Sequence, residues 1–199
     1  MAKESFKMDC HIHTFPMSGC SRMSPEEAID AAVGAGLDGI AITEHDCMWD
    51  SGGLQYLESV AGGRIKVFNG VEVSCSEGHF LVFGLKNMEG IHFGMRAEDL
   101  ISIAHGQSAA VVVAHPYRFS YEDGEYCYGL DLDGVEVMSS NTTATTGKYA
   151  VRLAGKLDVF RFASSDAHAI DTVGKYFNVF PFTMDSVDEL AGFLRRTKP

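Results

Sequence analysis

Short apolar runs alternate with longer amphipathic stretches along almost the whole chain. Short runs bounded by polar residues or glycine are typical of buried strands, whereas apolar positions recurring every three or four residues are typical of helices that pack on a sheet. This pattern predicts strands over residues 6–10, 39–43, 64–74, 79–85, 108–115, 133–138, 158–165 and 178–182. It predicts helices over residues 24–34, 54–61, 97–106, 142–154 and 184–196.

The first predicted helix carries clear boundary signals. Ser24 is a favourable N-cap, Pro25 fits the first helical position, and Glu27 completes a capping box three residues after the cap. Gly34 and Gly36 are typical of the residues that end a helix.

The alternation of strands and helices predicts a parallel sheet with helices outside it, built from about seven strand–helix units. One hairpin is expected to interrupt this order, because only residues 75–78 separate the strands 64–74 and 79–85. Asn69-Gly70 is expected to break the first of these two strands. The pattern allows either an open doubly wound sheet or a barrel. With no linker or repeat, a single domain over residues 1–199 is expected.

Composition narrows the class of protein. The 199 residues include 46% hydrophobic residues, enough for a sizeable core, and carry a formal net charge of −11. Such acidity disfavours nonspecific nucleic-acid binding, which depends on Lys and Arg at phosphates. We expect a soluble cytoplasmic protein, because no apolar run is long enough for a signal peptide or a membrane span and an odd number of cysteines fits free thiols. The cysteines are Cys10, Cys20, Cys47, Cys75 and Cys127.

Histidines and carboxylates gather where the predicted strands end. His11 and His13 follow the first strand and share a face, because alternate strand residues point the same way. The ends of parallel strands meet at one face of an α/β fold, where imidazole and carboxylate side chains together suit zinc, manganese or iron. The other residues of this kind at strand ends are Glu44, His45, Asp46, Glu72, His79, His115, Glu136, Asp166 and His168.

Taken singly, most of these residues have a simpler interpretation. Glu44 and Glu136 could be helix caps or surface charges, and an isolated histidine such as His92 or His105 is typically structural or solvated. However, five of the eight histidines follow predicted strands, and random placement along the chain explains this clustering poorly. They are His11, His13, His45, His115 and His168.

The motifs taken together resemble a known family. Between Asp9 and His168 the chain contains, in order, DCHIHT, AITEHD, GVEVS, GHFLVFGL, VVVAHPYR, DGVEVM and SSDAH. This succession resembles the PHP (polymerase and histidinol phosphatase) family. The resemblance implies a distorted, TIM-like (β/α)7 barrel that carries two or three divalent metal ions at its C-terminal face.

The resemblance also implies a set of metal ligands. They are His11, His13, Glu72 and Asp166 at the first ion, Glu72 again with His79 and His115 at the second, and His45 with His168 at the third. The chain departs from the family pattern after His13, where a further His or Asp is expected and FPMSGCS stands instead. Cys20 is a possible substitute because a thiolate is a good zinc ligand. Without it, His45 and His168 are free to serve the substrate.

The implied reaction is phosphoester hydrolysis by a hydroxide that two metal ions activate. His45 or His168, where not bound to metal, is a candidate to protonate the leaving oxygen. Arg118 is a candidate for bidentate phosphate binding, and Arg22 and Lys148 are weaker candidates.

Neighbouring residues are predicted to support the site. Asp9 shares the parity of the two histidines and is expected to orient one of them, whereas Cys10 is expected to point to the opposite face and pack inside. Asn141 is expected to cap the following helix, as Ser140 could, rather than bind substrate. The long aromatic and acidic loop 117–130 is a candidate lid.

Three functions follow from the resemblance. The first is a phosphoesterase that acts on a small phosphorylated metabolite, which the compact chain favours. The second is an enzyme similar to histidinol phosphatase. The third is a weakly catalytic metal-binding accessory domain, which the full set of ligands for two ions disfavours.

Overall fold

The computed structural model describes residues 5–196. Its sheet is built from eight strands, all of them in positions that the hydrophobic pattern predicts. They are β1 (Phe6–Ile12), β2 (Gly39–His45), β3 (Lys66–Ser74), β4 (His79–Phe83), β5 (Ala110–Val113), β6 (Gly134–Met138), β7 (Phe160–Ala163) and β8 (Asn178–Phe180).

Within residues 5–196 there are six α-helices and two short 3-10 helices. They are α1 (Pro25–Gly34), α2 (Ser51–Ala61), α3 (Ala97–Gly106), α4 (Tyr121–Tyr126), α5 (Ala144–Leu157) and α6 (Val187–Arg196), with η1 (Cys127–Gly129) and η2 (Ile170–Thr172). The capping box that the sequence predicts at Ser24 and Glu27 starts α1. No helix in this part of the chain is both long and apolar enough to cross a membrane.

The sheet curls into a nearly closed barrel with the strand order β7-β6-β5-β4-β3-β2-β1-β8. Strands β1 to β3 are parallel, as are β5 to β7, whereas β4 is antiparallel to both its neighbours and β8 is antiparallel to β1. The Asn178 side chain on β8 closes the gap to β7, donating to the Ala163 carbonyl (2.8 Å) and accepting from the Ala163 N–H (3.0 Å). This architecture confirms the distorted, TIM-like barrel and the predicted β3–β4 hairpin.

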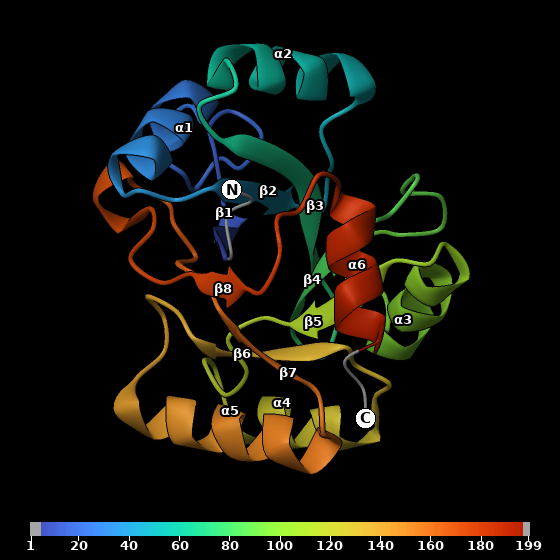
Figure 1. Cartoon of the computed structure of the whole chain (residues 1–199). Coiled ribbons are helices and arrows are strands. Elements are labelled where there is room, and N and C mark those ends of the chain that lie inside the picture. Colours follow the sequence, from blue (N-terminus) through green and yellow to red (C-terminus); the bar gives the residue numbers. More distant parts are fainter. Residues whose placement is uncertain (1–4, 197–199) are drawn as a thin grey trace.

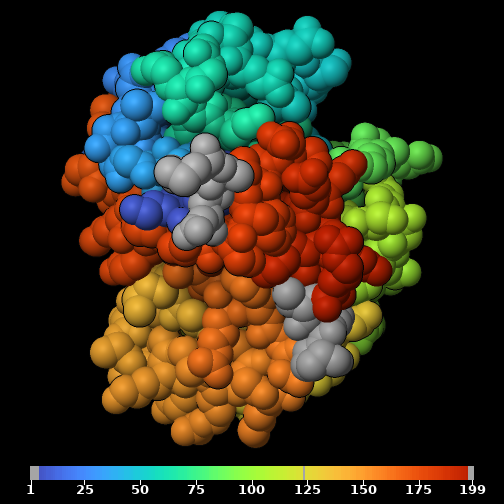
Figure 2. All heavy atoms as spheres, in the orientation of Figure 1, coloured from blue at the N-terminus to red at the C-terminus, as the bar shows by residue number. Residues whose placement is uncertain are grey.

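Helices surround the barrel and close one end of it. In Figure 1, α1 and α2 lie outside β1–β3, α3 outside β5, and α4 and α5 outside β6 and β7. Helix α6 packs on the cluster that fills the barrel interior, through Leu190, Ala191 and Leu194. Its partners there include Phe83 and Ala110, which lie at the end where the parallel strands begin. Figure 2 shows α6 covering the centre of this end, so the opposite end is left for a site.

Three local predictions need correction. Strand β3 runs unbroken through Asn69-Gly70, because it pairs with β2 and β4 on its two sides and a Cβ at Gly70 would come within 3.1 Å of the Phe83 ring. Helix α2 starts three residues early, at Ser51, because the Asp50 side chain caps it.

The third correction concerns the loop 117–130, which contains helix α4 and η1. Its buried Tyr117 packs its ring against Tyr149 of α5 (5.5 Å between ring centroids) and over Gly124, where a Cβ would lie 2.0 Å from that ring. The segment is therefore packed on α5, and its role as a lid stays a prediction.

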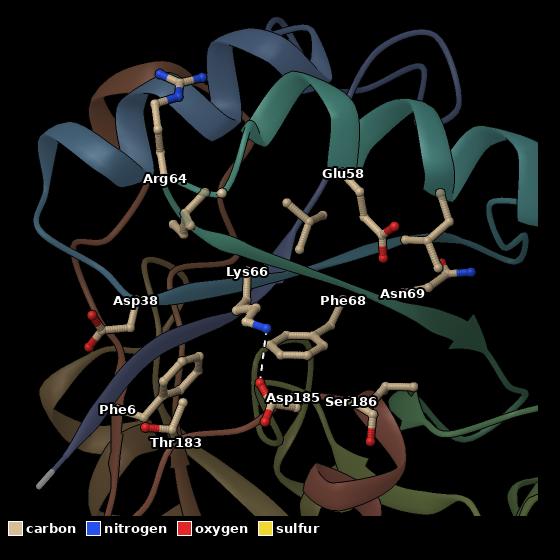
Figure 3. A pocket seen from close by; sticks show the side chains of 15 residues that line it. Phe6, Asp38, Glu58, Arg64, Lys66, Phe68, Asn69, Thr183, Asp185 and Ser186 are labelled. Carbon is tan, nitrogen blue, oxygen red and sulfur yellow. Dashed lines mark hydrogen bonds and ion pairs between the residues drawn. The ribbon is translucent and has the colours of Figure 1, made fainter. Parts of the chain in front are cut away.

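One hollow lies away from the C-terminal ends of the parallel strands. It holds about 730 Å³ between α2 and α6, and Figure 3 shows Phe6, Lys66, Phe68 and Asp185 around it. Lys66 and Phe68 lie near the start of β3, whereas Glu72 lies near its end, about 20 Å from Lys66 at roughly 3.3 Å per strand residue. The Lys66 ammonium pairs with the Asp185 carboxylate (2.9 Å) across the hollow. The hollow is therefore separate from the C-terminal ends of the parallel strands, where the candidate ligands lie.

Candidate metal centre

The predicted ligands converge at the C-terminal end of the parallel strands, although β1, β3, β5 and β7 are far apart in sequence. The Glu72 carboxylate lies at the centre of the group. Its Oε1 is 3.0 Å from His79 Nδ1 and 3.1 Å from His115 Nε2. Its Oε2 is 3.3 Å from His11 Nε2 and 3.1 Å from His13 Nε2. One carboxylate thus faces imidazoles from several separate segments of the chain, which suits a bridging ligand.

Three buried ligand atoms make contacts of 3.0–3.4 Å but, among the described residues, no hydrogen bond of acceptable geometry. They are His11 Nε2, His13 Nε2 and Glu72 Oε2. Leaving a buried polar atom unpaired costs about 1–3 kcal/mol, so native proteins rarely keep three of them together. A divalent cation among these atoms would satisfy all three, and imidazole with carboxylate is a donor set that zinc, manganese and iron accept. The residues present therefore fit a metal centre.

Within residues 5–196, three groups of ligand atoms are close enough to hold an ion, with all atoms of a group within 4.8 Å of one another. The groups are His11 with Glu72 and His115, His11 with His13 and Asp166, and His13 with His45 and His168. The first two contain a carboxylate, whereas the third is made of imidazoles alone. His79 belongs to none of these groups, but its Nδ1 contacts Glu72 Oε1 and its ring packs edge-on against the His115 ring (5.3 Å between centroids).

The third group lies at the mouth of the centre. The His45 and His168 rings stack on the His13 ring, with centroids 4.2 and 4.4 Å away, and both side chains are 30% exposed. Among the described residues, no group that could hold an ion includes Cys20, which is exposed. The geometry thus offers no support for Cys20 as a ligand.

The imidazoles of the centre change the pKa values of its carboxylates. Burial alone would raise the pKa of Glu72, but the imidazoles of His11, His115 and His13 hold it well below its usual range. Burial opposes ionisation of Asp166 in the same way, and His11 and His13 lower its pKa instead. The carboxylates remain ionised, and this negative charge attracts a cation.

Two ligands sit on unusual backbone. His115 and Asp166 have φ values of 29° and 50°, in the left-handed region that non-glycine residues rarely adopt. Such strain persists where the surroundings impose it, which is common at functional sites. At His115 the constraint is the Glu136 carboxylate, which accepts the His115 N–H (2.8 Å).

Glu136 is the main residue whose role the sequence did not reveal. Its side chain is fully buried inside the barrel. Its Oε1 accepts from His11 Nδ1 (3.0 Å) and from the Ser164 hydroxyl (2.8 Å), so it turns His11 Nε2 towards the centre. The interpretation as a cap or surface charge is wrong. The available signal was a single carboxylate inside the apolar strand GVEVM.

The supporting role predicted for Asp9 is wrong as well. Its carboxylate accepts the backbone N–H groups of Ser165 and Gly174, both at 2.9 Å, and that of His11 at 3.4 Å, but does not reach an imidazole. The parity argument fails because β1 has a bulge between Asp9 and Ile12. The bulge lets both Cys10, which is buried in the interior cluster, and His11 face the inside of the barrel.

Two polar residues flank the outer side of Asp166. Arg118 Nη1 lies 3.5 Å from Asp166 Oδ2, and its guanidinium covers the Phe119 ring at 5.1 Å. Asn141 Nδ2 also donates to Asp166 Oδ2. Asn141 and Ser140 are therefore not the caps of α5; Thr143 is, with a complete capping box.

The remaining candidates are peripheral. Arg22 and Lys148 have exposed side chains, and only the Arg22 backbone contacts the centre, donating to the His168 carbonyl (2.9 Å). His92 is exposed, and His105 pairs with Asp133 (2.9 Å) on the outside of the barrel. Glu44 is fully buried rather than on the surface.

The fold and the site together define the class: a TIM-like α/β barrel with a histidine- and carboxylate-rich centre for metal at the C-terminal ends of its strands. The family follows from comparison with known proteins. The PHP domain model matches residues 9–184, so the chain belongs to the PHP family. A search of curated proteins finds no match.

Solved structures share the barrel at low sequence identity. A two-domain protein from Bacteroides vulgatus, described as containing a predicted PHP-like metal-dependent phosphoesterase, is 19% identical, with a TM-score of 0.66 over 84% of this chain and 53% of that one. An amidohydrolase from Chromobacterium violaceum is 19% identical (TM-score 0.67; 94% and 96% covered). A lesion-specific endonuclease from Pyrococcus furiosus is 17% identical (TM-score 0.70; 96% and 56% covered). These likenesses support the fold alone.

Proposed function

We propose that this protein is a metal-dependent phosphoesterase that hydrolyses a small phosphorylated metabolite. The observation that carries the proposal is the trio of buried, unpartnered ligand atoms on His11, His13 and Glu72. Arg118, a third exposed beside Asp166, adds a cation at the place where a phosphate would meet the centre. We also propose a cytoplasmic location, because all five cysteines are free thiols.

The chain's own residues divide the work. Six side chains would hold two ions: His11, His13, Glu72, His79, His115 and Asp166. Divalent ions in such a site activate water and offset charge on the phosphoryl oxygens. Arg118 would bind two phosphate oxygens in the fork geometry of its guanidinium.

His45 and His168 have two possible duties in this proposal. With two ions bound, either imidazole could hand a proton to the leaving oxygen, because both rings lie at the partly exposed mouth of the centre. With a third ion bound, the His13–His45–His168 group would hold it. Counting the bound ions decides between these duties.

The net charge of the chain bears on the kind of substrate. A net charge of −11 disfavours a long polyanion, so a small phosphomonoester is the better match. The endonuclease among the structural neighbours makes a nucleic-acid substrate the outcome to test against. Two further hypotheses compete with this proposal: an enzyme similar to histidinol phosphatase, and a weakly catalytic accessory domain.

The first experiment is elemental analysis of protein purified without chelator or an affinity metal. Two or three equivalents of zinc, manganese or iron are expected, followed by turnover on a panel of phosphomonoesters, phosphodiesters and single-stranded DNA. Glu72→Ala and His115→Ala are expected to lose metal and turnover while remaining folded by circular dichroism. Protein that stays empty after incubation with these ions overturns the metal centre. Full occupancy without turnover favours the accessory domain.

A further inference from the structure

The carboxylate of Glu44 is fully buried at the end of β2 and is surrounded by four donors. Thr14 donates through its backbone N–H (3.0 Å) and its hydroxyl, Trp49 through its indole N–H (3.2 Å), and Ser18 through its hydroxyl (2.5 Å). An ionised carboxylate offers about four acceptor positions and no proton. In each of these four contacts, Glu44 is therefore the acceptor.

This fixes the direction of the hydrogen bonds at Ser18. The Ser18 hydroxyl has one proton, and it donates this proton in a hydrogen bond to the Glu44 carboxylate. Towards its other neighbours the Ser18 oxygen can only accept. One is the backbone N–H of His45 (3.1 Å), and the other is Nδ1 of His13 (3.3 Å). His13 Nδ1 must therefore carry a proton, and in the neutral ring this leaves the lone pair on Nε2.

His13 Nε2 is one of the three buried atoms of candidate ligands that, among the described residues, make no hydrogen bond. It lies 3.1 Å from Glu72 Oε2 and 3.4 Å from Asp166 Oδ1. We infer that Ser18 is a positioning residue: its hydroxyl relays the acceptor character of Glu44 to His13 and holds that imidazole in the tautomer that binds metal through Nε2. The inference rests on the metal centre proposed above and adds a control element outside it.

The neighbouring ligand supports this interpretation by contrast. His11 reaches its own carboxylate directly, since Nδ1 donates to Glu136 Oε1 at 3.0 Å. The partner of Nδ1 at His13 is a hydroxyl instead, and Ser18 connects it to the Glu44 carboxylate. The same oxygen also anchors the His45 backbone, so one side chain ties two ligands of the all-imidazole group to Glu44.

The first test needs no metal and no substrate. Nitrogen NMR of the histidine rings in metal-free protein, recorded at a pH high enough for the His11 and His13 rings to be neutral, reads the tautomer of each ring. His13 is expected as the Nδ1–H tautomer, with His11 as an internal reference in the same state. Ser18→Ala and Glu44→Gln are each expected to raise the fraction of His13 in the Nε2–H form. Both Glu44 oxygens accept hydrogen bonds in the wild type. In Glu44→Gln, whichever way the carboxamide is turned, its NH2 group faces groups that themselves donate, so the network around Ser18 is disturbed.

Two further variants control for general damage. Ser21→Ala removes a buried hydroxyl from the same loop, but that hydroxyl donates to the His13 backbone carbonyl (2.8 Å), so the tautomer is expected to stay unchanged. Ser18→Thr keeps the hydroxyl and is expected to restore the wild-type tautomer. Should Ser18→Ala fail to fold, Glu44→Gln carries the test alone.

The second readout is metal affinity, measured by competition with a chromophoric zinc chelator. Removing a partner behind a ligand typically weakens binding about 10- to 100-fold, and this loss is expected for Ser18→Ala and Glu44→Gln but not for Ser21→Ala. An Nε2–H tautomer of His13 in the wild type, or unchanged tautomer and affinity in both variants, overturns the inference. Wild-type protein that binds none of zinc, manganese and iron overturns the proposed metal centre instead, and the tautomer measurement still stands.

Discussion

At the residue scale, Glu136 is a buried carboxylate that contacts two of the candidate ligands from behind. It accepts from His11, Ser164 and the His115 backbone at once. Glu136→Gln replaces one acceptor oxygen by a donor and is expected to weaken zinc binding about 10- to 100-fold, because His11 loses its orienting partner. Chelator competition measures the change. Glu98→Gln, at an exposed carboxylate on α3, is the matched control, and equal losses in both variants would contradict the assignment.

Cys20 tests the edge of the centre. Partial burial and the negative charges of Glu72, Asp166 and Glu44 raise the pKa of its thiol, so little thiolate is available for alkylation. Bound cations would cancel part of that negative charge and lower the pKa. Iodoacetamide labelling of Cys20 is therefore expected to become faster when zinc is added. Protection instead of acceleration would make Cys20 a ligand, against the geometry; Cys75, whose pKa is raised to about 12 mainly by burial, is the reference thiol.

Residue types and their order along the chain are enough to predict which side chains meet. The rule that parallel strand ends share a face places the histidines and carboxylates after β1, β3, β5 and β7 together. The residues behind them are not predictable in this way. The prediction for Asp9 is wrong because a bulge in β1 changes the parity, and the sequence carries no signal for it. The role of Ser18 depends on three hydrogen bonds that only the folded loop creates.

At the element scale, the residues before α5 have different roles: one stabilises the helix and another contacts the candidate site. Thr143 caps the helix, whereas Asn141 two residues earlier contacts Asp166. Thr143→Ala is expected to cost about 1 kcal/mol, a fall of roughly 2–4 °C in Tm for a chain of this size, with metal content unchanged. Asn141→Ala is expected to change Tm little and to lower turnover. Thermal unfolding, elemental analysis and turnover of both variants check this, and the reverse pattern would restore Asn141 as the cap.

Elements with strong periodicity or caps are predictable, and those fixed by tertiary contacts are not. Ser24, Pro25 and Glu27 locate α1 because capping is a local interaction. Asn69-Gly70 misleads because the dipeptide is typical of turns, whereas pairing on both sides keeps β3 continuous. Helix α4 lacks a clear sequence signal because it is short and depends on packing against α5.

At the scale of the whole molecule, periodicity predicts a parallel α/β sheet but not its closure. An open sheet and a barrel have the same alternation of strands and helices. Closure depends on specific long-range pairs, such as the Ile12–Ala167 bridge and the Asn178 side chain at Ala163. The family resemblance supplies what periodicity lacks. The barrel also places the candidate site, because curling the sheet brings strands β1, β3, β5 and β7 around one point.

Because of that arrangement, a metal ion bound at the centre would connect strands from both halves of the barrel. Ligands from both parallel halves surround Glu72, so an ion bound there stabilises the folded chain but not the unfolded one. At a free zinc concentration about 100 times Kd the gain is roughly 2.7 kcal/mol. Each kcal/mol raises Tm by about 2–4 °C at this size, so zinc is expected to raise Tm by about 5–10 °C and a chelator to reverse it. Differential scanning calorimetry measures the shift. Glu72→Ala is expected to abolish it, and a shift that persists in that variant would place the stabilising ion elsewhere on the molecule.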